Sequence, residues 1–291
     1  MNPLRYDVVD VFTVDGAYTG NPLAVVHGGG ALTGEQMQVI AAEFGLSETA
    51  FPLPPTTPDA DYRLRIFTPS RELPFAGHPS VGAAWTLARA GLIRTGTVVQ
   101  ECGAGLLPVE VDDHGAQVTG GKPEVGQALD GPGLAAAVGL TAADVDPDVP
   151  AGVAGAGVPF AFLPVRPDAV ARAVPDAGAM RAALPDDLVG LSVVAFDRTN
   201  WRAHVRMFAP EAGVVEDPAT GSAAVALGVF LTDRGLLGAD GQSGFVVSQG
   251  AEIGRPSELA VLVRAEAGAA VTTSVRGNVA AVARGELLSV P

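Results

Sequence analysis

Two residues suited to acid/base chemistry occupy matching places in the two halves of the chain. His78 stands directly before Pro79, Asp217 stands directly before Pro218, and both prolines lead into small residues. Proline is favoured at the first position of a helix, so His78 and Asp217 are predicted to be N-cap residues. Asp is a preferred N-cap, and capping alone would explain an isolated Asp-Pro pair.

A functional interpretation follows if the two predicted helices begin on opposite sides of one cleft. The N–H groups of a first helical turn have no partner within the helix and attract carboxylates and phosphates. A histidine and a carboxylate would then face each other across a small anionic ligand. Gly77, Gly221 and Ser222 flank the predicted caps. These residues would let a ligand approach the backbone closely, or would simply allow tight packing.

Glu48 is the third candidate for acid/base chemistry. It lies in the segment Ser47–Phe51, which follows an amphipathic helical pattern and is predicted to be a strand. In a strand, Leu46, Glu48 and Ala50 share one face. A glutamate in such a place is commonly a solvated residue at a sheet edge. If the face is buried, the carboxylate is removed from water, which suits a group that takes a proton from carbon and returns it.

Other kinds of site lack the residues that they require. A metal site needs clustered ligands, but the four histidines are widely spaced and no C-x-x-C motif occurs, so no metal is expected. Ala116 and Pro123 break the nearest approximation to a phosphate-binding P-loop. The segment Gly241–Phe245 departs from the nucleophile elbow of serine hydrolases.

The elements that position the candidates are predicted to form a duplicated structure. Four blocks recur in the same order at a separation of about 140 residues. The matching segments are 20–26 with 157–163, 64–69 with 205–210, 78–84 with 217–223, and 87–93 with 231–237. Four matches in order are hard to obtain by chance, even in a chain rich in Ala and Gly. Each half is therefore expected to be an α+β domain, and the two domains are expected to meet at a cleft.

Local signals predict the elements of each half. Thr33 and Gln36 form a capping box, apolar residues follow at helical spacing, and Gly45 can end the helix. The two helices that carry the candidate caps are expected to end at Gly91 and Gly235. Strands are predicted over 46–51, 63–68, 97–111, 245–248, 259–264 and 279–288, with a Pro/Gly-rich join near 119–124.

Composition restricts the class of partner. The 291 residues are 48% apolar and 17% charged, which is enough apolar material for sizeable cores. The net charge is −14 and Lys122 is the one lysine, so nucleic acid and membranes are poor partners. The one cysteine, Cys102, excludes an internal disulfide, and no signal peptide or bilayer-spanning run is recognisable. A cytoplasmic protein that binds a small molecule is expected.

Several motifs resemble those of the phenazine-biosynthesis PhzF-like isomerases, and the resemblance covers essentially the whole chain. The matching segments are 10–26, Ser47–Phe51, Leu73–Ser80, Glu216–Ala223, Gln249–Gly250 and Gly254–Ser257. Ser80 is a small departure, because threonine is common at this position in the family.

The resemblance implies a fold. This is the diaminopimelate-epimerase-like fold, an α+β structure of two pseudo-symmetric domains, each a barrel-like, mostly antiparallel sheet around a central helix. The active site is expected in the cleft between them. In such folds the last strand returns to the first domain, so the first domain is predicted to comprise 1–118 with 279–291, and the second 119–278. Members are often homodimers.

The resemblance also implies a role for each candidate. Glu48 matches the catalytic acid/base, and His78 and Asp217 match groups that hold the substrate and assist the proton transfer. The positions that match contacts around the substrate carboxylate are Gly77, Gly221 and Ser222. Neither a cofactor nor a metal is implied. The expected activity is that of a cofactor-independent isomerase, which moves a proton between carbons of a small anionic metabolite.

Two alternatives stay open. An amino-acid racemase or epimerase of the same fold would use two opposed cysteines, whereas this chain has Cys102 alone, outside both helix-start motifs. A catalytically silent binding protein could lose Glu48, His78 and Asp217 without penalty, but all three are present. The identity of the substrate does not follow from these motifs.

Overall fold

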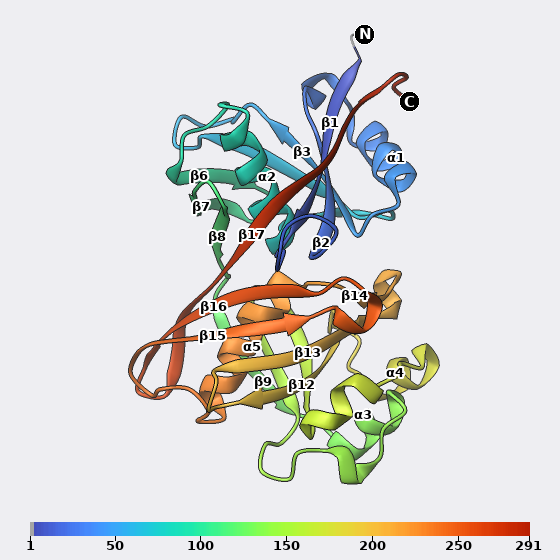
Figure 1. Ribbon diagram of the computed structural model, residues 1–291, viewed down its shortest axis with the longest axis vertical. Coiled ribbons are helices and arrows are strands. Elements are labelled where there is room, and N and C mark those ends of the chain that lie inside the picture. Colours follow the sequence, from blue (N-terminus) through green and yellow to red (C-terminus); the bar gives the residue numbers. More distant parts are fainter. Residues whose placement is uncertain (1–2) are drawn as a thin grey trace. The chain divides into compact units, whose positions relative to one another are not determined.

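The chain forms two compact units, joined where β17 (Ala269–Leu287) and the segment near Thr119 pass from one to the other. The structure, a computed structural model, describes residues 3–291. The first unit comprises residues up to Thr119 together with Arg276–Pro291, and the second comprises Gly120–Val275. In Figure 1, β17 is the long red strand, and its C-terminal part runs beside β1 in the first unit.

The first unit surrounds helix α2 (Gly77–Arg89) with a closed, barrel-like sheet. Neighbouring strands follow the order β17, β1, β2, β3, β4, β6, β7 and β8, and β8 pairs with β17 again. The β2–β3 and β4–β6 pairs are parallel and the other registered pairs are antiparallel. The strands are β1 (Leu4–Val11), β2 (Asn21–Val26), β3 (Glu48–Leu53), β4 (Tyr62–Phe67), β5 (Glu72–Leu73), β6 (Gly96–Cys102), β7 (Gly105–Val111) and β8 (Gly115–Thr119).

The second unit repeats this plan around helix α5 (Gly221–Asp233). The β11–β12 and β13–β15 pairs are parallel, and β9–β10, β10–β11, β12–β13, β13–β14 and β15–β16 are antiparallel. The strands are β9 (Pro123–Ala128), β10 (Gly152–Ala156), β11 (Pro159–Pro164), β12 (Leu191–Asp197), β13 (Arg202–Ala209), β14 (Val214–Asp217), β15 (Gly241–Gln249) and β16 (Ser257–Glu266). Because the parallel and antiparallel pairs recur in the same order, the predicted internal duplication is confirmed.

Helix α2 lies in the interior of its unit because its sequence is small and apolar on nearly all sides. Every residue from Gly77 to Leu87 is buried. At Gly82, an added Cβ would lie 2.6 Å from Leu23 and 2.7 Å from Val11, so glycine lets the helix press directly against β1 and β2. Helix α5 is buried in the same way, with all but one residue of 221–232 buried. The predicted central helix of each domain is therefore confirmed.

The remaining helices cover the outside of the sheets. Helix α1 (Gly34–Phe44) has the predicted capping box of Thr33 and Gln36, and Gly45 ends it in a left-handed conformation. Its apolar face packs with Phe51 and Phe67 in an outer core. In the second unit, α3 (Gly131–Ala137) and α4 (Ala177–Ala183) pack with residues of β11, β12 and β13 in a larger core.

The starts of the two central helices differ from the prediction. Helix α2 begins at Gly77 with Ala76 as N-cap, so His78 lies inside the first turn and Pro79 is the third helical residue. Helix α5 begins at Gly221 with Thr220 as N-cap. Asp217 is the last residue of β14, three residues before that cap. The prediction that His78 and Asp217 are N-cap residues was therefore wrong.

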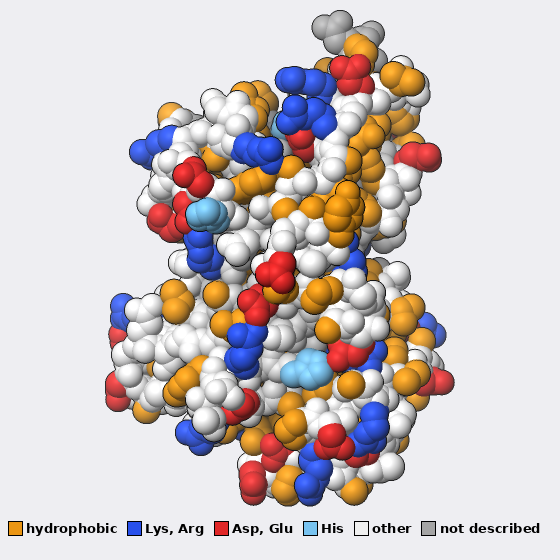
Figure 2. All heavy atoms as spheres, in the orientation of Figure 1, with side chains coloured by type: hydrophobic (Ala, Val, Ile, Leu, Met, Phe, Trp, Pro, Cys, Tyr) orange, Lys and Arg blue, Asp and Glu red, His pale blue; other side chains and the backbone are white. Residues whose placement is uncertain are grey.

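The surface carries acidic and basic side chains in mixed groups. On the face shown in Figure 2, Lys and Arg side chains occur in small clusters with Asp and Glu nearby, and no continuous basic area crosses that face. Arg284 with Asp7, and Arg202 with Glu258, are ion pairs of this exposed kind. Among the helices of residues 3–291, none has both the length and the apolar character needed to cross a bilayer.

Candidate active site

A carboxylate and an imidazole meet inside the first unit. Glu48 Oε2 lies 3.1 Å from His78 Nδ1, and the two side chains are 18% and 4% exposed. Two residues on elements separated in sequence by the strands β4 and β5 are thus brought to hydrogen-bond distance. An ionised carboxylate only accepts, and a neutral imidazole nitrogen can donate or accept, so one proton can reside on either partner of this pair.

The strand pattern explains the position of Glu48. It is the first residue of β3 and stands opposite Leu23 of the parallel strand β2. Phe51 belongs to the outer core with α1. Because side chains alternate, Glu48 and the fully buried Ala50 point the other way, toward α2. The face predicted for Glu48 is therefore a buried face, which was the condition for its acid/base role.

The second nitrogen of His78 is also buried. Nε2 has no hydrogen-bond partner among residues 3–291. A buried, unsatisfied polar atom costs free energy, and in native proteins it commonly marks a place where a ligand or water completes the hydrogen bonds. His78 can thus contact Glu48 through Nδ1 and offer Nε2 to a bound molecule.

The start of α2 provides backbone donors beside this pair. Gly77 is the first helical residue, and the N-cap Ala76 has no side chain that could cap the first turn. The Ser80 hydroxyl, in the same part of the helix, donates its proton to the carbonyl of Ala76 at 2.9 Å. The positive end of the helix dipole therefore lies at Gly77 and His78, where an anionic group would be stabilised.

Asp217 has its own set of partners in the second unit. The Thr220 hydroxyl donates to Asp217 Oδ2 at 2.6 Å. The Gln249 amide donates to the Asp217 carbonyl at 2.7 Å and to Thr220 Oγ1 at 3.1 Å. All three residues are buried. The carboxylate is consequently held by a network of fixed hydrogen bonds within one unit.

Gly221 and Ser222 form the first turn of α5, directly after this network. Thr220 is the N-cap, yet its side chain makes no capping hydrogen bond; its oxygen accepts from the Gln249 amide and its proton goes to Asp217. The first-turn N–H groups of α5 are therefore not covered by the cap side chain. This resembles the start of α2, although the residues that produce it differ.

Sequence reasoning located Glu48, His78 and Asp217 but assigned no role to Thr220 or Gln249. Thr220 lies within the Asp-Pro-Ala-Thr-Gly-Ser motif, and its position as the residue before Gly-Ser was the available signal. Gln249 comes near Asp217 only through the parallel pairing of β13 and β15, which the sequence alone does not specify.

Among the residues that the structure describes, no group of three or more His, Cys, Asp or Glu side chains could hold a metal ion. The first unit thus offers a carboxylate, an imidazole and a helix start, and the second unit offers a hydrogen-bonded aspartate and a helix start.

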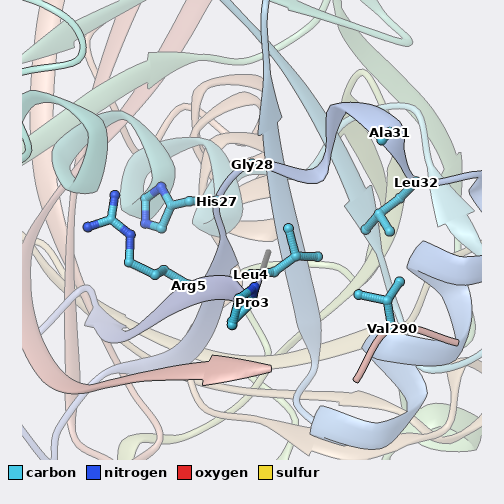
Figure 3. A pocket seen from close by; sticks show the side chains of 8 residues that line it. All are labelled: Pro3, Leu4, Arg5, His27, Gly28, Ala31, Leu32 and Val290. Carbon is cyan, nitrogen blue, oxygen red and sulfur yellow. The ribbon is translucent and has the colours of Figure 1, made fainter. Parts of the chain in front are cut away.

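A separate pocket of the first unit contains none of the candidate residues. It has a volume of about 330 Å³ and lies at the C-terminal end of β2, beside His27. Glu48 stands opposite Leu23, nearer the other end of that strand. Figure 3 shows Arg5 and His27 on one side of it and Leu4, Leu32 and Val290 on the other. His27 Nε2 is 2.8 Å from Asp7 Oδ2, so this imidazole already has a local hydrogen-bonding partner.

Comparison with known proteins gives consistent matches along the chain. The family model described as "Phenazine biosynthesis-like protein" matches residues 9–285. An uncharacterized isomerase of Mesorhizobium japonicum is 36% identical over 302 residues, covering 99% of both chains. The trans-2,3-dihydro-3-hydroxyanthranilate isomerase of Pseudomonas aeruginosa is 36% identical over 295 residues, covering 97% of this chain and 98% of that protein.

Solved structures match the fold equally completely. A phenazine biosynthesis protein of the PhzF family from Bacillus anthracis superimposes with a TM-score of 0.88 at 27% identity, covering 99% of this chain and 100% of that one. A probable proline racemase from Agrobacterium radiobacter matches with a TM-score of 0.66 at 15% identity, covering 98% and 93%. The second likeness concerns the fold alone, and together they confirm the predicted two-domain, epimerase-like architecture.

Proposed function

Because the chain belongs to the phenazine biosynthesis-like family of isomerases, we propose that it moves a proton between two carbons of a small, carboxylate-bearing metabolite. Glu48 is the proposed proton carrier, and His78 and Asp217 hold the substrate and assist the transfer. Gly77, Gly221 and Ser222 are proposed to bind the substrate carboxylate. The observation that carries this proposal is the buried contact of 3.1 Å between Glu48 and His78.

The proposed reaction needs no group beyond these side chains. The Glu48 carboxylate takes a proton from one carbon, and the electron pair of the broken C–H bond moves into the conjugated system of the substrate. The resulting carboxylic acid then returns a proton to a different carbon, so that substrate and product are isomers. General acid/base catalysis of this kind requires a group that is held close to the reacting carbon and protected from water. The Glu48 side chain is 18% exposed, so most of its surface is shielded from water.

The relatives suggest a first substrate to test. Two curated proteins that match this chain, from Pseudomonas aeruginosa and Pseudomonas chlororaphis, are named trans-2,3-dihydro-3-hydroxyanthranilate isomerases. Their overlap with this chain exceeds nine-tenths of its length. We propose a substrate of the same chemical class, a small ring or chain that carries a carboxylate next to a conjugated system.

Incubation with trans-2,3-dihydro-3-hydroxyanthranilate in deuterated water tests the proposal. We expect an isomeric product that carries deuterium on the newly protonated carbon, to the extent that the Glu48 proton exchanges with water. The reaction is run with excess EDTA and without redox cofactors, and it should be unaffected. NMR and mass spectrometry of the product measure both outcomes. Conversion that depends on an added metal or redox cofactor would contradict the proposed chemistry.

The working form that we propose is a homodimer, as the family resemblance implies, and we propose a cytoplasmic location, which fits the single cysteine. Sedimentation equilibrium should then give twice the 29.4 kDa of one chain at micromolar concentration. A mass of one chain at all concentrations tested would contradict this part of the proposal.

A further inference from the structure

We propose that Gln249 and Thr220 are positioning residues that act through Asp217. In this proposal, which rests on the proposed function, the Gln249 amide fixes the direction of the Thr220 hydroxyl, and that hydroxyl keeps Asp217 ionised and in one orientation. The evidence is a hydrogen-bond network buried entirely within the second unit.

The chemistry of the acceptors fixes the orientation of the Gln249 amide. A backbone carbonyl cannot donate, so the Gln249 atom 2.7 Å from the Asp217 carbonyl must be the NH₂ group. The same NH₂ group lies 3.1 Å from Thr220 Oγ1, while Gln249 Oε1 faces the Thr220 N–H at 3.4 Å. Gln249 is 2% exposed, which limits competition from water.

The direction of the Thr220 hydroxyl follows from this assignment. Its oxygen accepts a proton from Gln249, so its own single proton is free to be donated in another direction. Asp217 Oδ2 lies 2.6 Å away, a distance typical of an O–H donor to an ionised carboxylate. A proton on Oδ2 would oppose this donor. The network therefore stabilises the ionised form of Asp217.

The Thr220 side chain does not cap the helix that it precedes. Threonine at an N-cap ordinarily accepts a hydrogen bond from a first-turn N–H, and the absence of that bond destabilises the helix. Thr220 occupies the N-cap of α5 but makes no capping bond. Departures from local stability rules are expected where a residue serves a site, and here the diverted hydroxyl serves Asp217.

Gly250 explains how Gln249 reaches Asp217. Its φ is +78°, and an added Cβ would lie 2.6 Å from the Pro218 carbonyl and 2.4 Å from the Arg255 carbonyl. Only glycine allows this conformation and this approach without strain. The Gln-Gly pair thus brings the end of β15 against the residue that follows Asp217.

Charged side chains near the network have hydrogen-bonding partners of their own. Arg206 of β13 and Glu216 of β14 pair with each other through two hydrogen bonds of 2.9 and 2.6 Å. Glu252, which follows β15, lies 2.7 Å from His204 of β13. These charged side chains therefore each have a partner other than Asp217, and the Thr220 hydroxyl donates to Asp217 Oδ2.

The test compares Thr220→Val with Thr220→Ser, and uses Thr232→Val as the matched control. Thr232 is a buried residue of the same helix whose hydroxyl donates to the Gly228 carbonyl, so the same change is made away from Asp217. We expect Thr220→Val to lower kcat for trans-2,3-dihydro-3-hydroxyanthranilate by about tenfold, with a smaller change in KM. Thr220→Ser and Thr232→Val should stay within about threefold of the unmodified protein, and Gln249→Leu should follow Thr220→Val.

A second readout is independent of turnover. Carbon-13 NMR of Asp-labelled protein, assigned with Asp217→Asn, follows the titration of the Asp217 carboxyl. The titration should move to higher pH in Thr220→Val but not in Thr220→Ser or Thr232→Val. If Thr220→Val and Thr232→Val give the same titration and the same kcat, the positioning role is wrong. If the unmodified protein lacks turnover while the titration still moves, the network is supported and the proposed function fails alone.

Discussion

Replacement of Glu48 by Gln is expected to lower turnover of trans-2,3-dihydro-3-hydroxyanthranilate by about 10²-fold or more, the scale typical of general acid/base catalysis. Gln has the same size and can still accept a hydrogen bond from His78, but its amide cannot take a proton from carbon. Binding should therefore be largely retained while the chemical step is lost. Single-turnover kinetics, and calorimetric titration of the Glu48→Gln protein with trans-2,3-dihydro-3-hydroxyanthranilate, separate these two effects.

The matched control is Glu43→Gln, which makes the same change at an exposed glutamate of α1. It should leave turnover within about twofold of the unmodified protein, because exposed charges away from a site have small effects. Thermal unfolding of both variants checks that each is folded. Near-normal turnover of Glu48→Gln would show that another group carries the proton, even though the fold assignment would stand.

The contact with His78 decides how Glu48 can work. Since Nδ1 is 3.1 Å from the carboxylate and Nε2 is buried without a partner among the described residues, the imidazole can bridge Glu48 and a bound molecule. His78→Asn should therefore weaken both binding and turnover, whereas Glu48→Gln should affect turnover alone. This difference separates a residue that carries the proton from one that mainly holds the substrate and assists the proton transfer.

Local sequence signals predicted parts of the fold well. The Thr33–Gln36 capping box and the Gly45 end of α1 were correct because both depend on hydrogen bonds between residues a few positions apart. Gly91 and Gly235 were also placed correctly, each with positive φ just beyond a central helix. Such signals are local, so an isolated sequence is enough to recognise them.

The two prolines led to wrong predictions of where the helices start, for a physical reason. The first N–H groups of a helix have no intrahelical acceptor, so proline fits several positions of the first turn, and Pro79 takes the third rather than the first. After Pro218 the chain does not turn into a helix until Gly221. His78 and Asp217 occupy matching places in the two sequence repeats, but His78 lies in the first turn of a helix whereas Asp217 ends a strand.

The partners of the candidate residues could not be predicted because they depend on strand pairing. Glu48 on β3 contacts His78 on α2, which the barrel-like sheet surrounds. Gln249 contacts Asp217 because β13 pairs in parallel with β15. A glutamine at the end of an apolar strand is unremarkable in sequence. Its importance follows only from which backbone carbonyl and which hydroxyl the fold brings to its amide.

Removal of Arg206 is expected to give the largest loss of stability of the variants considered. Arg206 and Glu216 are 10% and 8% exposed and form a two-bond ion pair, and a third guanidinium nitrogen donates to the Ala173 carbonyl at 2.5 Å. The hydrogen bonds that Arg206 donates to Glu216 raise the pKa of the Arg206 guanidinium above its ordinary value. Arg206→Leu would leave Glu216 buried without its partner, which should lower the free energy of unfolding by about 3–5 kcal/mol.

Urea unfolding of Arg206→Leu, Glu216→Leu and the double variant tests this expectation. The double variant should recover much of the loss, because burying two apolar side chains avoids the desolvation of an unpaired charge. Arg181→Leu is the control, since Arg181 and Glu211 form a similar pair but are 71% and 53% exposed, and it should cost less than about 1 kcal/mol. Equal losses of unfolding free energy for Arg206→Leu and Arg181→Leu would contradict the expectation, because they would show that removing one partner of a buried ion pair costs no more than removing one partner of an exposed pair. A large loss of stability in the two single variants, but not in the double variant, would instead show that neither charge tolerates burial without its partner. The ion pair between β13 and β14 would then be needed for the stability of the region next to Asp217.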